Sequence, residues 1–317
     1  MENKEIAKKT KTASERYSDM VLKEFSALSG EVVVFDQNQK RLAQHLFVKA
    51  DASLKTLEAK RVSDNKTAML PYTWTNINLT KLAVDSVHRI EIGLDALIPN
   101  HLSMIPYWNK HLKKYDLDLQ IGYVGKDFYR RKMAYDSPVD IIYELVHESD
   151  IFEPIKKSQG IDIESYKFEI KQPFRRGNIV GGFGYIVYKD PTMNKLVIVT
   201  EAEFKESEAL SKGGFWKKSP KAMRYKTIVN RATDKILIDP DKTSVSFFEV
   251  EKQENGDEFD ESDDEQIIDV DFEEKQPEND QALKESQAKA VDIEPEQSEF
   301  DQVKATVEKE KELKPDF

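Results

Sequence analysis

Charge is divided so unevenly along this chain that only part of it can form a hydrophobic core. Residues 249–317 hold 26 Asp and Glu against 8 Lys and Arg, and phenylalanine is their only aromatic residue type. So few apolar side chains cannot offset roughly 1 to 2 kcal/mol of backbone entropy per ordered residue, and the segment is predicted to be a disordered acidic tail. Residues 1–248 carry a net charge of +7, although the whole chain carries −11. The negative total therefore conceals a basic body.

The body is long enough for one large domain or two small ones, because a chain of this length buries roughly 70 to 75% of its unfolded surface. It contains no run near the roughly 18 apolar residues of a membrane span, and its Lys-rich N-terminus lacks the apolar centre of a signal peptide. The absence of cysteine excludes disulfides and thiolate metal sites. We therefore expect a soluble cytoplasmic protein with no membrane contact.

Hydrophobic spacing predicts helices on both sides of a group of strands. Helical periodicity is found at 14–28, 39–60, 79–92, 125–135, 201–210 and from Pro220 onward. The second of these could be interrupted near Asp51. Runs of β-branched and aromatic residues predict strands at 31–35, 100–108, 117–123, 139–147, 166–171, 179–188 and 196–200. Thr200 and Glu203 are expected to form a capping box at the start of the helix 201–210.

These elements indicate an α+β protein, in which helices flank a mainly antiparallel sheet and the disordered acidic tail follows. Residues 1–248 are assigned to one domain, whose first part, residues 1–78, is expected to be helical. The tail is assigned to residues 249–317.

Two segments of the body, 119–132 and 217–235, interleave aromatic rings with cations, and Phe174-Arg175-Arg176-Gly177 lies between them. Rings can stack on bases while cations neutralise phosphates, so this pattern is typical of a surface that holds a single strand of nucleic acid. The candidate phosphate contacts are Lys126, Arg130, Arg131, Arg175, Arg176, Lys217, Lys218, Lys221 and Lys226. The candidate aromatic supports are Tyr107, Tyr123 and Trp216. Any one of the lysines could instead be an ordinary solvated residue, and Tyr123 and Trp216 could equally be core residues.

Short motifs in the same order resemble the RecT family of phage recombination proteins. They are Gly93-Leu94, 102–107 (LSMIPY), 119–125 (LQIGYVG), Arg176-Gly177 before 181–185 (GGFGY), Trp216-Lys217, 222–223 (AM) and 226–229 (KTIV). The likeness covers residues 79–238, roughly half of the chain. It departs from the family at Val124, where the motif Gly-Tyr-Lys-Gly usually has its lysine. Lys126 is the candidate to supply that cation from the neighbouring turn.

The resemblance implies a protein that binds single-stranded DNA and anneals complementary strands in phage-type homologous recombination and DNA repair. It implies that residues 1–248 form the DNA-binding and annealing domain, with contacts between subunits from residues 1–78, and that the protein acts in the cytoplasm of a bacterial host cell. It implies a recombinase with no catalytic residue and no cofactor, which uses no ATP and does not require Mg for binding. The expected partners are single-stranded DNA, the annealed duplex intermediate and further copies of the chain in a ring or helical filament. A phage exonuclease and a host single-strand binding protein are further candidates.

Two other classes of function stay open. Asp190, the strand 196–200 and Glu203-Phe204-Lys205 distantly resemble the metal-binding arrangement of nucleases, although the capping box competes for Glu203. The alternative without enzymatic activity is a phage scaffold or assembly protein whose basic face meets an acidic partner. In either binding class the acidic tail could compete for the basic surface. The glycines at 181–184 lie in a strand pattern, which favours a bulge or a close approach of strands over a functional loop.

Overall fold

The protein is described by a computed structural model that covers residues 11–30, 32, 34–211 and 214–256. By its contacts the chain divides into Met1–Asp269 and Val270–Phe317, and every described residue belongs to the first unit. The α-helices are α1 (Ala13–Ser29), α2 (Gln37–Ser63), α3 (Leu79–Ile92), α4 (Tyr123–Lys132), α5 (Glu201–Leu210), α6 (Phe215–Lys218), α7 (Pro220–Thr233) and α8 (Val245–Gly256). The strands are β1 (Leu102–Asn109), β2 (Lys114–Ile121), β3 (Asp140–His147), β4 (Ile151–Ile155), β5 (Ser165–Glu169), β6 (Ile179–Val187) and β7 (Lys195–Thr200). These strands pair only in antiparallel fashion, and the predicted α+β class is confirmed.

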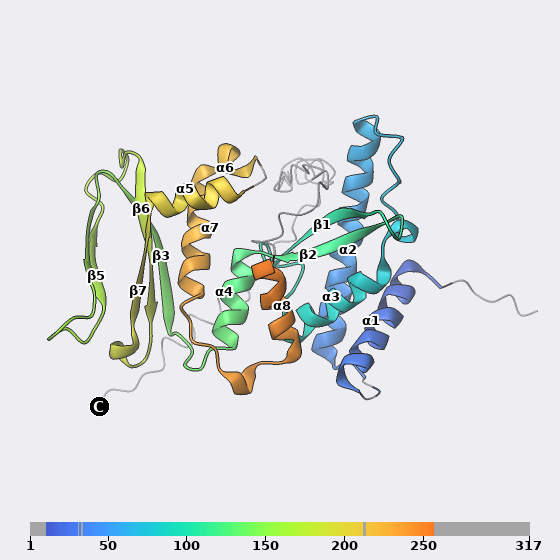
Figure 1. Cartoon of the computed structure of the whole chain (residues 1–317), viewed down its shortest axis with the longest axis horizontal. Helices are drawn as coiled ribbons and strands as arrows, with labels where there is room; N and C mark the ends of the chain where they lie inside the picture. The colour runs from blue at the N-terminus through green and yellow to red at the C-terminus, as the bar shows by residue number, and fades with distance from the viewer. Residues whose placement is uncertain (1–10, 31, 33, 212–213, 257–317) are drawn as a thin grey trace, which may run out of the picture. The chain divides into compact units, whose positions relative to one another are not determined.

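The three-stranded sheet β3-β6-β7 packs one face against α5 and α7 (Figure 1). Successive residues of a strand point to opposite faces, so alternate side chains of β3 and β7 reach the helices. They join helix residues in one apolar cluster, which consists of Leu145, Val199, Phe204, Trp216 and Ile228. Burial of such side chains contributes roughly 1.5 to 3 kcal/mol each, and the cluster therefore fixes both helices on the sheet.

Glycines in the central strand β6 allow α7 to lie unusually close to the sheet. A Cβ atom added at Gly184 would lie 2.4 Å from the Cβ of Ala232, and one at Gly182 would lie 2.1 Å from Cδ1 of Ile228. Real Cβ atoms do not approach other atoms so closely, so a side chain at either position would force its neighbours on α7 to move. The sequence predicted a bulge or a close approach of strands, whereas the nearest neighbour of Gly182 and Gly184 is the helix α7.

The opposite face of the sheet is covered by the hairpin β4-β5. The ring of Phe183 on β6 is stacked at 4.7 Å on Phe152 of β4 and lies 4.5 Å from Tyr166 and 5.5 Å from Phe168 of β5. The sequence does not predict β4, because its five residues include Pro154, which lacks the N–H group that a ladder needs.

A second assembly joins the hairpin β1-β2 to α1, α2 and α3. The buried Tyr17 of α1 donates a hydrogen bond of 2.8 Å to Ser86 of α3. The predicted break of α2 near Asp51 is wrong: the helix runs through this residue, whose carboxylate accepts a hydrogen bond from Nε1 of Trp74 at 2.9 Å. The strand predicted at 31–35 is also wrong for the residues described there, 32 and 34–35, which are irregular.

Helix α8 corrects the predicted start of the acidic tail. Residues 249–256 are helical, and α8 packs on α3. Val250 is fully buried and Phe247 is 4% exposed, so an apolar pair three positions apart holds the acidic segment to the body. The remainder of the predicted tail, 257–317, lies outside the described residues.

Candidate nucleic-acid interface

The two predicted basic segments meet where α4 packs on α7. Gly122, from the motif 119–125, helps to place α4, because it lets the chain pass close to the backbone of Asn100. A Cβ added at Gly122 would lie 2.2 Å from the carbonyl oxygen of Asn100. From the first turn of α4, the Tyr123 ring lies 6.1 Å from Tyr225 of α7, and Tyr225 lies 6.2 Å from Tyr143 of β3. The half-buried Tyr123 therefore belongs to an aromatic contact that ties helix, helix and sheet together.

Two of the candidate cations on α4 form ion pairs within the protein. Lys126 Nζ lies 2.9 Å from a carboxylate oxygen of Asp234, just beyond α7, and its side chain is 15% exposed. Arg131 pairs with Asp127 at 2.9 Å, and the same Asp127 oxygen accepts a hydrogen bond of 2.7 Å from Tyr143. Lys126 is therefore a poor replacement for the cation that the motif loses at Val124, because a phosphate would have to displace a carboxylate.

Arg130 is held by α8. Its guanidinium pairs with Glu251, whose other oxygen accepts a hydrogen bond of 2.7 Å from Tyr129. Burial alone would lower the pKa of Arg130, but the attraction of Glu251 outweighs it and the pKa is raised. The arginine remains charged and is neutralised inside the fold.

Arg176 also has a structural partner. Its guanidinium contacts Asp150, with 2.6 Å between the nearest atoms, donates to the Leu145 carbonyl at 2.8 Å and lies over the ring of Phe168. The Asp150 side chain is fully buried. Burial would raise the pKa of Asp150, but hydrogen bonds from Arg176 and from the His147 backbone lower it. The sequence interpretation made Arg176 a candidate phosphate contact, whereas in the structure it binds Asp150 and the Leu145 carbonyl and so holds a turn.

Trp216 lies in the core. Its side chain is 5% exposed and belongs to the cluster between the sheet, α5 and α7. A base cannot stack on a ring that other side chains already cover, so the interpretation of Trp216 as a core residue is confirmed and the stacking role is not available in this fold.

Three of the candidate cations, Arg175, Lys217 and Lys221, are exposed and have no ion-pair partner among residues 11–30, 32, 34–211 and 214–256. Lys218 is also exposed, and Lys226 is half-buried on α7. Both of these residues have further interactions within the protein.

The unpaired cations gather at one end of the sheet. Arg175 directly precedes Arg176, which binds the carbonyl of Leu145, and the Leu145 side chain shares its cluster with Trp216. Lys217 follows Trp216, and Lys221 lies in the first turn of α7. This end, where β3 leaves the sheet and β6 enters it, will be called the cationic end and is defined by Arg175, Lys217 and Lys221.

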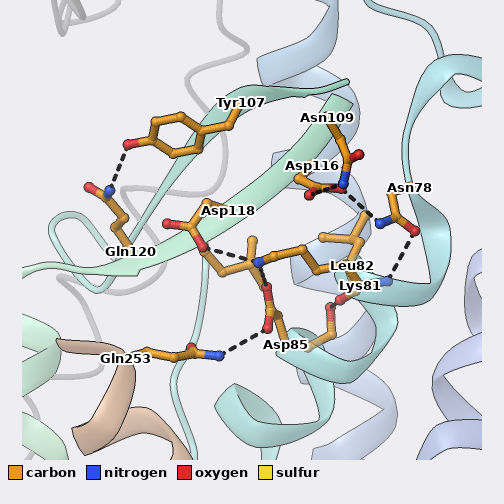
Figure 2. A network of polar contacts seen from close by, with 12 residues as sticks. Asn78, Lys81, Leu82, Asp85, Tyr107, Asn109, Asp116, Asp118, Gln120 and Gln253 are labelled. Atoms are coloured by element: carbon orange, nitrogen blue, oxygen red, sulfur yellow. Dashed lines mark hydrogen bonds and ion pairs between the residues drawn. The ribbon is translucent and has the colours of Figure 1, made fainter. Parts of the chain in front are cut away.

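Tyr107 lies on β1, in the hairpin that packs on α3, whereas the other candidates lie on α4, α6, α7 and the loop before β6. Its hydroxyl accepts a hydrogen bond of 3.2 Å from Gln120 of β2 (Figure 2). Beneath the hairpin, Lys81 contacts Asp85 at 2.7 Å and Asp118 at 3.4 Å. Tyr107 therefore borders a structural network that joins the hairpin to α3.

The nuclease-like arrangement does not assemble. Glu203 completes the predicted capping box of α5, since it accepts a hydrogen bond of 2.7 Å from the Thr200 backbone and donates its own N–H to the Thr200 hydroxyl. Asp190 instead caps the short 3-10 helix Pro191–Met193 before β7. The two carboxylates thus lie at opposite ends of a six-residue strand, roughly 20 Å long, which is too far apart to share one metal ion.

The sequence interpretation missed two aromatic residues of this region and one arginine. Tyr143 and Tyr225 complete the contact made by Tyr123, and the guanidinium of Arg224 lies 6.0 Å from the ring centroid of Phe204. Tyr225 and Arg224 were within the basic segment 217–235, and their helical spacing could have indicated a face toward the sheet. Tyr143 gave no signal beyond its strand pattern.

Comparison with known families identifies the class of protein. The sequence model of the RecT family matches residues 93–282, well over half of the chain, and the protein belongs to that family. This membership assigns it a role in DNA recombination by single-strand annealing and implies binding of single-stranded DNA. The match includes all the candidate site residues and extends past α8. A search of the curated proteins found no match. In the described ranges, none of the helices has the length and apolar character needed to cross a membrane.

Proposed function

We propose that this protein anneals complementary DNA strands without ATP, as an oligomer that binds single-stranded DNA at the cationic end. The observation that supports this site is that some candidate cations form ion pairs within the protein and others do not. Lys126 and Arg176 are paired with carboxylates, whereas Arg175, Lys217 and Lys221 have exposed and unpaired charges within the described residues. Unpaired cations bind phosphate without first losing an internal ion pair.

The chemistry of annealing fits contacts of this kind. Two strands repel each other through their phosphates, and lysine and arginine reduce that repulsion without reading the sequence. Base edges must stay free to test a second strand. Pairing itself then supplies the driving force, about 1.4 kcal/mol for each base-pair step, so the reaction requires neither a nucleotide cofactor nor Mg for binding.

The proposal extends to partners of the chain. Oligomerisation into a ring or filament is assigned to residues 1–78, and a phage exonuclease and a host single-strand binding protein are the proposed suppliers of DNA. Native mass measurement with and without oligonucleotide tests the first, and pull-down with the purified proteins tests the second. Location in the bacterial cytoplasm follows from these partners.

A salt titration of DNA binding tests the cationic end. Lys217→Ala and Lys221→Ala should each weaken binding of single-stranded oligonucleotide and make the plot of log affinity against log salt shallower by about 0.7. Lys189→Ala is the matched control, because Lys189 is exposed and lies just beyond the opposite end of β6. Equal effects of all three substitutions would refute the site, since they would indicate only a dependence on net charge.

An annealing assay separates the classes of function. Complementary labelled oligonucleotides should pair faster with the protein, in EDTA and without ATP, and the strands should keep their length. Shortening of the strands on addition of Mg, abolished by Glu203→Gln, would favour the nuclease. Neither pairing nor shortening would favour a scaffold protein.

The acidic segment after α8 is proposed to compete with DNA for the cationic end. Because α8 extends to Gly256, truncation should follow that residue and leave Val250 in place. Removal of 257–317 should tighten binding at low salt and change the salt slope. Unchanged affinity and slope would exclude competition.

A further inference from the structure

The loop that enters β6 presents an aromatic ring to solvent. Phe174 is 98% exposed, the highest value among the large apolar residues of the described ranges. A ring in water gains nothing from the fold, while burial of a phenylalanine contributes roughly 1.5 to 3 kcal/mol elsewhere in a protein. The position is therefore one where a partner could supply the missing contact.

The ring is held by a tight turn. The backbone N–H of Arg175 donates to the carbonyl of Gln172 at 3.0 Å, which closes a four-residue β-turn with Phe174 in its third position. Pro173 occupies the second position, where its fixed φ favours the turn. Such a turn reduces the conformational entropy that a contact at its tip would otherwise lose.

The turn is also anchored where it joins the sheet. Arg176 clamps the buried Asp150, and the N–H of Ser149 donates to the Arg176 carbonyl at 3.1 Å. Glu148 accepts hydrogen bonds of 3.0 Å from the backbone and the side chain of Asn178. By holding this loop, Arg176 fixes the backbone from which the Phe174 side chain projects.

The surroundings of the ring favour a nucleic-acid strand over a protein. Lys171, Gln172 and Arg175 flank it, so its neighbours along the chain are mainly polar or charged, whereas a protein interface is marked by a contiguous apolar patch. Arg175 adds an unpaired cation beside the ring, within the cationic end. A ring next to a free cation provides stacking for a base and a contact for the adjoining phosphate.

We propose that the turn 172–175 is a base-stacking finger, in which Phe174 stacks on or between bases of the bound strand and Arg175 holds the neighbouring phosphate. Apolar side chains that enter between bases interrupt their stacking. The finger would thereby separate bases of the held strand and leave their edges open to a complementary strand. This inference rests on the proposed function and specifies how the same site handles bases.

Substitution of the ring tests the finger through affinity, salt dependence and base environment. Phe174→Ala should weaken binding of single-stranded DNA by about fivefold to 150-fold, which corresponds to one lost stack, with an unchanged salt slope because no charge is removed. Phe174→Trp should retain the affinity. Arg175→Ala should instead make the slope shallower by about 0.7.

A 2-aminopurine oligonucleotide reports the stacking directly. Its fluorescence should change when the wild-type protein binds, and Phe174→Ala should remove much of that change at saturating protein. Tyr135→Ala is the matched control, because Tyr135 is 66% exposed and precedes β3 at the opposite end of the sheet. This control should leave both affinity and fluorescence as in the wild type.

Several outcomes would overturn the finger. If Phe174→Ala keeps the affinity and the fluorescence change while Lys217→Ala weakens binding, the proposed function survives without the finger. If Phe174→Ala alters only the native mass of the oligomer, the ring is a contact between subunits. If the wild-type protein binds no oligonucleotide at low salt, the proposed function itself fails.

Discussion

The close packing of α7 against the glycines of β6 allows a quantitative prediction of the stability lost on substitution of Gly184. A Cβ at position 184 would lie 2.4 Å from the Cβ of Ala232, whereas carbon atoms in contact are normally 3.5 to 4.0 Å apart. Gly184→Ala must therefore move α7 away from the sheet by roughly 1 Å. Overpacking of a core costs about 1 to 3 kcal/mol, and replacement of glycine in a strand returns about 0.5 to 1 kcal/mol. We expect a net loss of about 1 kcal/mol in the free energy of unfolding.

A double-mutant cycle assigns that loss to one contact. Without the Ala232 methyl, the nearest atoms to the new Cβ are Tyr143 Cδ1 at 3.6 Å and the Cα of residue 232 at 3.8 Å, which are ordinary distances. Gly184→Ala should then stabilise the protein by about 0.5 to 1 kcal/mol in an Ala232→Gly background, because the clash is gone and the strand loses a glycine. Ala232→Gly alone costs about 1 kcal/mol of helix propensity. The expected coupling energy is about 2 kcal/mol.

Urea unfolding followed by circular dichroism, at one protein concentration, measures all four corners of the cycle. Gly214→Ala serves as the control, because no atom lies within 4 Å of a Cβ added there, and it should shift stability by less than about 0.5 kcal/mol. Equal losses from Gly184→Ala in the two backgrounds would refute the argument. Because Lys221 lies on α7, DNA affinity should fall with the single substitution and recover in the double one.

Three further predictions concern buried groups. Burial lowers the pKa of His88 and His101 below 6.5, so below that pH the unfolded chain takes up protons that the folded chain does not. Urea titrations should therefore show stability that is present above about pH 6.5 and is lost as the pH falls below that value, less so in His88→Gln. Trp216→Ala should lower stability by about 3 to 5 kcal/mol in thermal unfolding, whereas a surface ring would leave it unchanged. Arg176→Ala should cost about 3 to 5 kcal/mol because it leaves the Asp150 carboxylate buried and unpaired, and addition of Asp150→Asn should recover part of that loss in the same assay.

The elements predictable from the sequence are those with local signals. The capping box at Thr200 and the left-handed Gly93 at the end of α3 mark helix boundaries through hydrogen bonds within a few residues. The elements that were missed depend on distant contacts. Helix α8 contains Val250 within an acidic stretch, and its burial against α3 decides the structure there. The four-residue α6 is likewise held by Trp216 in the core rather than by propensity.

The sequence identified the cations of the candidate site. It did not predict which of them form ion pairs within the protein. Lys126 pairs with Asp234, 108 positions later in the chain, and Arg130 pairs with Glu251, 121 positions later. No spacing rule indicates such partners, because ion pairs between helices depend on how the helices pack. The sequence therefore cannot distinguish a paired cation from an unpaired one, and only the fold separates them.

The difference between paired and unpaired cations predicts which of them DNA contacts first. A strand that approached α4 would have to displace Asp234 from Lys126 or Glu251 from Arg130, and each exchange loses one charge-assisted contact for every one gained. At the cationic end Arg175 exchanges only water and counterions, and release of those ions favours binding. Binding should therefore begin at the cationic end, and any later recruitment of α4 would require α8 to give up Arg130. Removal of the Glu251 carboxylate by Glu251→Gln should then increase affinity only if α4 takes part, while loss of the finger should weaken binding in either case.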